Sequence, residues 1–336
     1  MKKILFLNPN KWGRGITAIW IASHSSILKK NGFGVKLFDS TFYLNWTNNE
    51  TEYNTANKQY KKSKYLEYVK FKKSNIYEDL QKTIDEFSPD IIFWSAISSH
   101  IHGEGEYVNI QYGNELLKKI NTNAIKIAGG LQATAEPKLI LKKFTMIDIL
   151  IRGESELILN EIAKKIDNKN EIYKLNGIAY KRNDKIIIND NQKIISDLDI
   201  IPNYDYSIFS DEVFYRPYNG KVVRAVDYEL SRGCIYACEY CVETVIQKYY
   251  GIKKTTPRGT IHNPNLYLRN KSAKRIFDEI SDLSKNYKIE LFRCQDTNFL
   301  TINRKVLNEL SELIEKSKLN CYLYIETRPE GINSTS

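Results

Sequence analysis

Residues 222–241 read VVRAVDYELSRGCIYACEYC, a strand-like run that leads directly into three closely spaced cysteines. The run at 222–230 is rich in apolar and β-branched side chains, which favours a strand. Gly233 then permits a tight turn into the following loop. A loop that leaves the carboxyl end of a strand lies where barrels and open α/β sheets place their sites. The stretch therefore predicts an α/β fold with a functional site in the cysteine loop.

The three cysteines, Cys234, Cys238 and Cys241, are spaced C-x3-C-x2-C. In so short a loop each sulfur can reach a different iron of a small cluster. Iron–sulfur clusters normally take four cysteine ligands, so three would leave one iron open to another ligand. A structural zinc ion would need a fourth Cys or His, and both remaining cysteines, Cys294 and Cys321, lie in strand-like apolar patterns. We therefore predict a redox-active iron–sulfur cluster, with zinc or inert buried thiols as the alternatives.

The overall composition is that of a globular protein. The chain has 336 residues, of which 42% are hydrophobic and 12% aromatic, and this length favours two domains. Five cysteines, three of them clustered, argue against a disulfide framework. No apolar stretch is long enough for a membrane span, and the run at residues 2–7 ends too early for a signal peptide. A soluble cytoplasmic protein is therefore expected.

The formal net charge of +10 would attract polyanions, but it is spread thinly along the chain. Within residues 58–73, lysines alternate with aromatic residues, a pattern that suits phosphate contacts and base stacking. A solvated amphipathic helix explains the same pattern. Nucleic acid is therefore an alternative partner and not the expected one.

The first half of the chain alternates short apolar runs with helical patterns. The runs are near-continuous, as in strands buried on both faces of a parallel sheet, and they lie at residues 4–7, 35–38, 91–94, 125–128 and 149–151. Apolar residues at helical spacing within 76–87 and 157–166 predict amphipathic helices between the strands. This alternation predicts an open, doubly wound parallel sheet of the Rossmann-like type over residues 1–170.

The rest of the chain divides into two further segments. Residues 171–210 are predicted to hold a β-hairpin at 175–190 and a linker at 197–209. Residues 211–336 start a second strand–helix series, which predicts about half of a (β/α) barrel, with strands at 222–230, 289–293 and 322–327. Residues 44–74 interrupt the first sheet with a polar stretch, which we predict to be an excursion on the surface.

Small residues follow three strands of the first half. Ser95 follows one strand, Gly129 and Gly130 end the next, and Gly153 with Glu154 follows a third. On successive strands of one parallel sheet, such residues would line the crevice beyond the carboxyl ends. Glycine at those positions would let a large flat ligand approach the backbone.

The cysteine loop resembles the signature of the radical S-adenosylmethionine superfamily, in its C-x3-C-x-aromatic-C pattern with Tyr240 as the aromatic and in its lead-in, 229–234. The resemblance implies a 4Fe-4S cluster whose open iron takes the amino and carboxylate groups of S-adenosylmethionine. Electron transfer then cleaves that molecule to a 5′-deoxyadenosyl radical. It also implies that the backbone near Tyr240 meets the adenine and that Asp296 helps to hold the methionyl amino group, with a helix cap as the alternative for Asp296. Residues 326–328 end the third strand, where such enzymes place polar active-site groups; a surface ion pair is the alternative.

The first half resembles the cobalamin-binding domain of cobalamin-dependent radical S-adenosylmethionine proteins, and the two resemblances together cover nearly the whole chain. They imply cobalamin in the crevice, contacted by residues at the strand ends, namely Ser95, Gly129, Gly130, Gly153 and Glu154. The D-x-H-x-x-G motif that supplies a histidine to cobalt is absent, because none of the four histidines has that context, namely His24, His100, His102 and His262. Cobalamin is therefore expected without a histidine ligand, and a sheet that keeps the fold but binds nothing is the alternative.

The resemblance implies an enzyme that methylates an unactivated position of a small-molecule or natural-product substrate, with a reducing partner such as flavodoxin or ferredoxin. A ring closure or rearrangement with the same cofactors is one alternative, and RNA modification is another. Methylthio-transferring radical enzymes carry three further cluster cysteines, and this chain has no cysteine before Cys234, which excludes them. Because only three barrel strands are expected, the radical domain is expected to be incomplete, and an inactive fragment is the last alternative.

Overall fold

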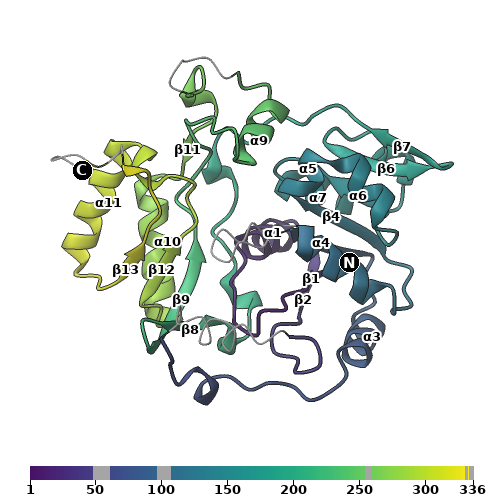
Figure 1. Ribbon diagram of the computed structural model, residues 1–336, viewed down its shortest axis with the longest axis horizontal. Coiled ribbons are helices and arrows are strands. Elements are labelled where there is room, and N and C mark those ends of the chain that lie inside the picture. The colour runs from purple at the N-terminus through teal and green to yellow at the C-terminus, as the bar shows by residue number, and fades with distance from the viewer. Residues whose placement is uncertain (48–60, 97–106, 254–258, 330–331, 333–336) are drawn as a thin grey trace.

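The computed structural model describes residues 1–47, 61–96, 107–253, 259–329 and 332. Within them, two main sheets are joined by a buried connection, and a two-stranded ribbon lies beside the cysteine loop (Figure 1). His100 and His102 fall outside the described residues. In the described part of the chain, no helix has the length and apolar character needed to cross a membrane.

The first sheet has seven strands in the order β2-β1-β3-β4-β5-β6-β7. Five are parallel and match the five predicted runs, namely β1 (Lys3–Asn8), β2 (Gly34–Asp39), β3 (Ile91–Ala96), β4 (Ile125–Gly130) and β5 (Ile149–Ile151). The predicted hairpin adds two antiparallel strands at the edge beside β5, namely β6 (Ile178–Arg182) and β7 (Lys185–Ile188). Asn183 and Asp184 both have positive φ, as the tight hairpin turn requires. The predicted α/β fold with a mostly parallel sheet is confirmed.

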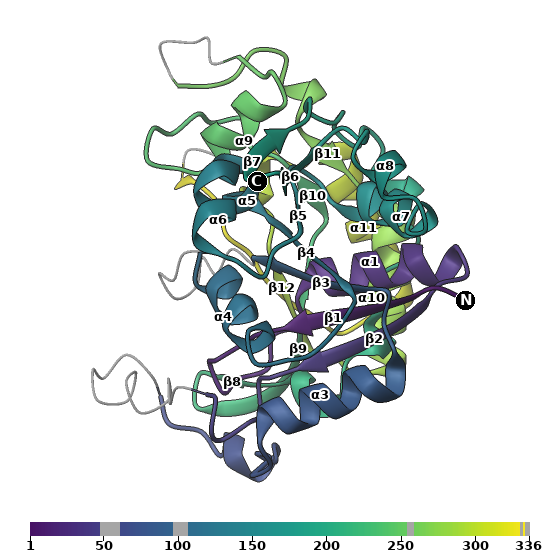
Figure 2. The same cartoon turned by 90° about the vertical axis from the view of Figure 1, so that its right-hand side faces the viewer.

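Helices cover both faces of this sheet. Strand β1 shows why, because Ile4 and Phe6 belong to one apolar cluster while Leu5 and Leu7 belong to another on the opposite face. Figure 2 shows α1 and α3 on opposite sides of β1 and β2. The helices of this half are α1 (Ile19–Lys30), α3 (Ile76–Phe87), α4 (Tyr107–Leu117), α5 (Leu131–Ala135), α6 (Pro137–Lys143), α7 (Glu156–Lys164) and α8 (Lys169–Ile172). Helix α1 was not predicted, because small polar residues such as Ser23 and Ser25 are buried in it alongside apolar ones and hide the helical period.

The second sheet has the order β13-β12-β9-β8, in which β9, β12 and β13 are parallel and β8 is antiparallel to β9. Its strands are β8 (Tyr215–Tyr218), β9 (Lys221–Tyr228), β12 (Leu291–Cys294) and β13 (Tyr322–Tyr324). The ribbon and helices around it are β10 (Ser231–Arg232), β11 (Arg269–Asn270), α9 (Glu243–Tyr249), α10 (Ala273–Asn286) and α11 (Arg304–Ser317). Helices α10 and α11 lie on the outer side of this sheet, away from the first one (Figure 1).

The segment predicted as a linker, 197–209, runs between the two sheets and is packed. Leu198, Ile201 and Tyr206 are buried, and they belong to an apolar cluster that also contains residues of both sheets. The segment is wound into short 3-10 turns, namely η2 (Leu198–Ile200), η3 (Tyr206–Ile208) and, just after it, η4 (Asp211–Phe214). Because the sheets share one apolar core, neither half is expected to fold alone.

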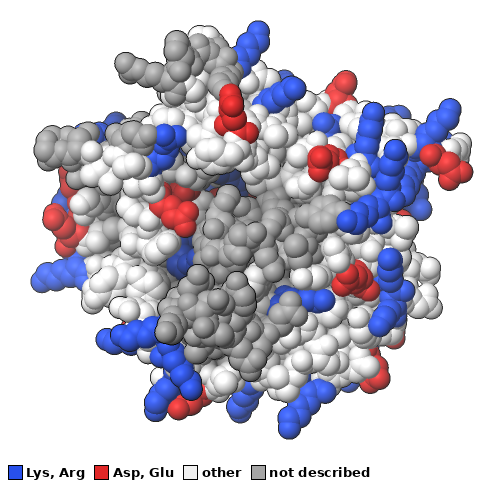
Figure 3. All heavy atoms as spheres, viewed as in Figure 1, with Lys and Arg blue, Asp and Glu red and all other residues white. Residues whose placement is uncertain are grey.

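The polar stretch at 44–74 was predicted to lie on the surface, and for part of it this is wrong. Trp46, Tyr65 and Val69 are buried, and a short 3-10 turn, η1 (Tyr65–Glu67), lies between them. Residues 48–60 fall outside the described residues. The lysines of this stretch hide its aromatic anchors, which pack inward. On the face shown in Figure 3, basic and acidic side chains are interspersed around the rim.

Candidate functional site

The cysteine loop lies at the carboxyl end of β9, between the ribbon β10–β11 and helix α9. Cys234 is 6% exposed, and Cys238 and Cys241 are half-buried. Gly233 has a φ of 97°, and a Cβ there would lie 2.4 Å from the carbonyl oxygen of Tyr267. Only glycine fits this turn, which sets the direction in which the loop leaves the sheet.

The loop presents its sulfurs as a set of ligands. The amide of Tyr236 donates to Cys234 Sγ at 3.4 Å, and the amide of Cys241 donates to the Cys238 carbonyl at 3.0 Å. Burial is the main cause that raises the pKa of Cys234 to about 11, and the charges of Glu243 and of the other two cysteines act in the same direction. Three thiolates in one short loop repel one another, and the cationic charge of iron would offset that repulsion. The donor set fits an iron–sulfur cluster.

No three His, Cys, Asp or Glu side chains among the described residues converge as the ligands of a single metal ion would. This does not bear on a cluster, because in a cluster each sulfur binds a different iron and the sulfurs lie farther apart. The zinc alternative thus gains no support from this part of the chain.

Arg328 reaches the loop from the segment after β13. Its Nη1 donates to Cys238 Sγ at 3.3 Å, and its guanidinium lies 4.0 Å from the centre of the Tyr236 ring. The preceding Thr327 donates from Oγ1 to Asn298 Oδ1 at 2.7 Å, which ties this segment to the end of β12. The sequence predicted a polar active-site group or a surface ion pair at 326–328, and the hydrogen bond to a cysteine sulfur was not foreseen.

Asp296 holds the lead-in to the loop. Its carboxylate is 3% exposed and accepts hydrogen bonds from the Leu230 amide at 3.1 Å and from the Ser231 amide and hydroxyl at 2.6 and 2.5 Å. Burial raises its pKa to about 6. The helix cap considered as an alternative is not what these contacts form, and a contact with S-adenosylmethionine stays a prediction. Tyr240 is 91% exposed, so its surface is available to a ligand.

Three of the residues predicted to line the crevice, Ser95, Gly129 and Gly130, lie where β3 and β4 end. Ser95 pairs with Gly129 in the parallel register, so both lie at the same level of the sheet. Gly130 has φ 106° and ψ −176°, a conformation that is essentially restricted to glycine. A Cβ on Gly129 would lie 3.3 Å from the Phe93 ring, under the sheet. Gly129 therefore serves packing within the fold, and Gly130 is the glycine whose backbone turns out of the sheet.

Gly153 and Glu154 lie beside this edge but face other parts of the protein. A Cβ on Gly153 would lie 2.5 Å from the Tyr250 hydroxyl. The group that approaches this glycine closely is therefore Tyr250, the C-cap residue of helix α9. The Gly153 amide donates to Thr134 Oγ1, which in turn donates to the Gly130 carbonyl, at 2.8 and 2.9 Å. The ends of β4 and β5 are thereby tied together, and contacts of Gly153 and Glu154 with cobalamin stay predictions.

Glu154 is the centre of a buried ion-pair network that links the crevice to the cysteine loop. Arg269 donates to both of its oxygens at 2.8 and 2.9 Å, and Arg232 donates to one at 3.2 Å. Arg232, two residues before Cys234, also donates to Glu156 at 2.6 Å. Burial opposes ionisation of Glu156, but the charge of Arg232 outweighs it and lowers the Glu156 pKa to about 2. Sequence reasoning missed this network, because its partners lie 76 to 115 residues apart.

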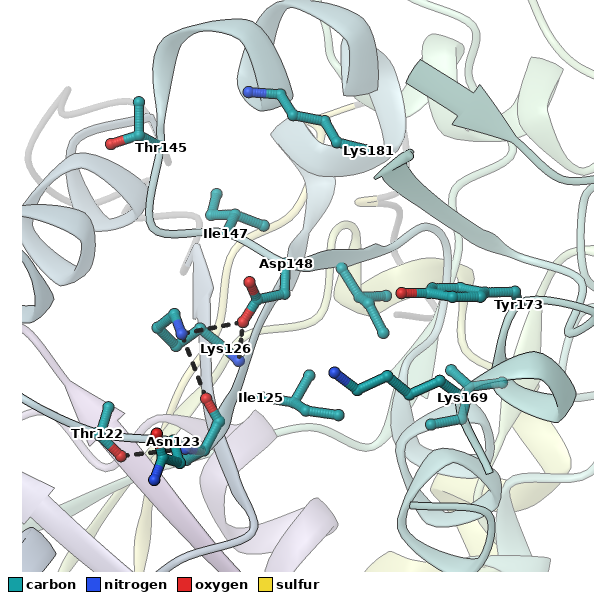
Figure 4. Close-up of a pocket in the computed structure, with 13 residues that line it drawn as sticks. Thr122, Asn123, Ile125, Lys126, Thr145, Ile147, Asp148, Lys169, Tyr173 and Lys181 are labelled. Atoms are coloured by element: carbon teal, nitrogen blue, oxygen red, sulfur yellow. Dashed lines mark hydrogen bonds and ion pairs between the residues drawn. The ribbon is translucent and has the colours of Figure 1, made fainter. Parts of the chain in front are cut away.

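A cavity of about 210 Å³ lies between the two predicted sites. Gly130 and Gly153 line it from the crevice, and Arg232 and Gly233 line it from the cysteine loop. The cavity thus lies between the residues that lead into the cysteine loop and the ends of β4 and β5. A second cavity, of about 460 Å³, lies at the opposite edge of the sheet, at the amino ends of β4 and β5, where Lys126 pairs with Asp148 at 3.1 Å (Figure 4).

His24 is a core residue. It is buried in α1, where Nε2 lies 2.8 Å from Ser155 Oγ and Nδ1 lies 2.6 Å from the Trp20 carbonyl oxygen. Its ring stacks on Phe93 at 5.2 Å. Both ring nitrogens are therefore engaged within the protein beneath the sheet, as expected for a packed histidine.

Curated relatives match most of the chain at low identity. An uncharacterized methyltransferase of Pyrococcus horikoshii is 26% identical over 76% of this chain and 50% of its own length. The anaerobic magnesium-protoporphyrin IX monomethyl ester cyclase of Rubrivivax gelatinosus is 24% identical over 98% of this chain and 51% of its own. The chain thus spans about half the length of these relatives. No family model matches the sequence.

Solved structures share the fold over nearly the whole chain. The radical S-adenosylmethionine methyltransferase TsrM from Kitasatospora setae, with cobalamin and a 4Fe-4S cluster bound, superposes with a TM-score of 0.68, at 15% identity, over 99% of this chain and 57% of its own. The cobalamin-dependent radical enzyme OxsB, with aqua-cobalamin bound, gives 0.61 at 14% identity over 96% and 38%. TsrM has also been solved with a S-adenosylmethionine analogue and its substrate tryptophan. The cofactors predicted from the sequence are those that these neighbours carry. The chain therefore has the fold of the cobalamin-dependent radical S-adenosylmethionine enzymes, and the resemblance predicted from its sequence is confirmed.

Proposed function

We propose that this protein is a cobalamin-dependent radical S-adenosylmethionine enzyme, acting in the cytoplasm, that methylates an unactivated position of a small molecule. The observation that carries the proposal is the junction itself. Arg232 and Gly233, which lead into the cysteine loop, and Gly130 and Gly153, at the ends of β4 and β5, line one cavity.

Cys234, Cys238 and Cys241 would hold the 4Fe-4S cluster, with S-adenosylmethionine beside Tyr240. When bound, these cofactors supply a radical able to abstract hydrogen from unactivated carbon and a methyl donor, chemistry that no side chain provides. Asp296 fixes the lead-in of the loop through Leu230 and Ser231. The strands β9, β12 and β13, with α10 and α11 outside, would be the first strands of a barrel, over residues 211–336.

Cobalamin would lie over the ends of β3 and β4, at Ser95 and Gly130, within a first domain at 1–170. The fit there rests on the half-buried backbone of Gly130, since Gly153 and Glu154 are engaged by Tyr250 and by Arg269. The ion-pair network around Arg232 and Glu154 would fix the position of this crevice relative to the cysteine loop. Flavodoxin or ferredoxin would supply the electron.

A second candidate is a ring closure with the same cofactors and no methyl transfer. It is favoured by relatives that are named as cyclases, one of which aligns over 98% of the chain. The absence of a cobalt-ligating histidine motif suits both reactions.

The test uses the full chain, reconstituted anaerobically with iron, sulfide and cobalamin, together with methyl-labelled S-adenosylmethionine and a small-molecule extract as substrate source. Methylation predicts label in a product, formed together with 5′-deoxyadenosine and S-adenosylhomocysteine. 5′-Deoxyadenosine without S-adenosylhomocysteine would favour the cyclase. Neither product, from protein that contains its cluster, would contradict both.

A further inference from the structure

The four-stranded sheet has a polar face that the cysteine loop does not use. Strand pairing places Asp227 of β9, Arg293 of β12 and Tyr324 of β13 side by side. Their neighbours Tyr228 and Phe292 pack with α10, so these three point the other way, toward the first half of the chain. We call this side of the sheet its inner face.

Asp227 accepts hydrogen bonds from residues of this sheet and of the first half of the chain. Arg216 donates to it at 2.6 Å, and Thr17, which precedes α1, donates from both its amide and its hydroxyl at 3.0 and 3.1 Å. Gln295 donates to the second oxygen at 3.1 Å. Two carboxylate oxygens have about four acceptor positions, so these contacts nearly exhaust them.

Arg293 has few interaction partners among the described residues. Among the described residues it has two neighbours of opposite or aromatic character, Asp227 at 3.5 Å and the Tyr324 ring centre at 6.0 Å, and no side-chain hydrogen bond. Its side chain is nevertheless only 14% exposed. Arg216 already neutralises Asp227, and Arg14 adds positive charge near Arg293, so positive charge is in excess on the inner face. None of the Arg293 nitrogens is among the buried side-chain atoms without a partner, so the guanidinium keeps donors that a ligand can reach.

We propose that Arg293 binds a carboxylate of the small-molecule substrate. A guanidinium offers a planar fork of N–H donors that matches a carboxylate in two parallel hydrogen bonds. Arg293 lies near the carboxyl end of β12, beside the end of β9 from which the cysteine loop leaves, so a substrate held there would lie at the same end of the sheet as the proposed cluster. The half-exposed Tyr324 ring beside it marks the open side. This inference rests on the proposed function and narrows its substrate class to carboxylic acids.

The first experiment uses the iron-free full chain and sodium acetate as the probe, with acetamide as its neutral isostere, at constant ionic strength set with sodium chloride. We expect acetate to raise the thermal unfolding midpoint of the wild type in a saturable manner, and acetamide to leave it unchanged. Arg293→Gln should abolish the acetate response. Arg182→Gln, which removes an exposed arginine of the β6–β7 hairpin, should keep it. An acetate response that is equal in Arg293→Gln and wild type would overturn the proposal.

The second experiment needs no ligand and separates a binding role from a structural one. Arg293→Met removes positive charge from a face that has an excess of it, so the unfolding midpoint of the free protein should stay level or rise. Arg216→Met leaves Asp227 buried without its cation, so its midpoint should fall. A fall for Arg293→Met as large as that for Arg216→Met would show that Arg293 is structural and would contradict the proposal.

The third experiment tests whether Arg293 binds the carboxylate of the substrate or that of S-adenosylmethionine, which also carries one. The affinity of the reconstituted protein for S-adenosylmethionine should be the same for wild type and Arg293→Gln. A tenfold or greater loss would assign Arg293 to the cofactor and overturn its assignment to the substrate. Failure of the proposed function would appear differently, as wild-type protein that takes up no iron, and it would leave the acetate result unchanged.

Discussion

Replacing Arg328 by Gln would remove a positive charge that lies 3.3 Å from Cys238 Sγ. If Cys238 ligates iron, a metal–sulfur bond of about 2.3 Å puts the guanidinium about 5–6 Å from the site that accepts the electron. At an effective dielectric constant near 20, a unit charge at that distance contributes about 3 kcal/mol, which partial exposure reduces to about 1–2 kcal/mol. Because about 1.4 kcal/mol corresponds to about 59 mV for one electron, the reduction potential should fall by roughly 40–80 mV.

The assay is a redox titration of the reconstituted cluster, followed by its paramagnetic signal. Arg328→Lys keeps the charge and should shift the potential less than Arg328→Gln does. Arg182→Gln makes the same change in net charge far from the loop and should leave the potential at the wild-type value. A potential for Arg328→Gln that equals the wild type, in protein with the same iron content, would refute the claim that Arg328 acts on the cluster.

Three further predictions concern stability, measured by denaturant unfolding of the full chain. Gly15→Ala would place a Cβ 2.3 Å from the Val213 carbonyl oxygen at the junction of the two halves and should lower the free energy of unfolding by about 2 kcal/mol or more. Gly32→Ala, at a residue with positive φ but open space around it, should lower it by about 1 kcal/mol. Equal losses for the two variants would contradict close packing at the junction. Glu154→Gln removes the carboxylate that pairs with buried Arg269 and should cost about 3 kcal/mol, and a cost below about 1 kcal/mol would contradict the network. Asp296 has a folded pKa near 6, above its usual value of 3.8, so the stability that its proton contributes is present below pH 4 and lost as the pH rises through 6. Relative to Asp296→Asn, the wild type should therefore gain about 1 kcal/mol between pH 7 and pH 5, and no change with pH would show that the carboxyl is not perturbed.

The parallel strands could be predicted closely because each is an uninterrupted apolar run, buried on both faces. The segment Ile149–Ile151 was predicted to the residue. Helix α1 could not be predicted from the sequence, because its buried face mixes apolar residues with Ser23, Ser25 and His24, whose partners come from distant loops. The connection at 197–209 was predicted to be a linker because its aspartates and Pro202 dominate the local pattern, although most of its apolar residues are buried.

Part of the candidate site could likewise be predicted from the sequence, and part could not. The cysteines are local in sequence, so their spacing alone revealed them. The contacts of Arg232, Arg269 and Arg328 join residues that are far apart in the chain, and no local spacing encodes them. Gly153 was recognised as a position that needs glycine, but the close neighbour is Tyr250 of the protein itself. A sequence identifies such a glycine without identifying what approaches it.

The measurement that tests the account most directly is the iron content and paramagnetic signal of the full chain after anaerobic reconstitution. We predict about four irons per chain and a reduced signal that S-adenosylmethionine perturbs. Alanine at Cys234, Cys238 or Cys241 should abolish both, whereas Cys294→Ala and Cys321→Ala, at cysteines outside the loop, should leave both intact. Stoichiometric zinc without iron, or a cluster that survives the loss of a loop cysteine, would contradict the account.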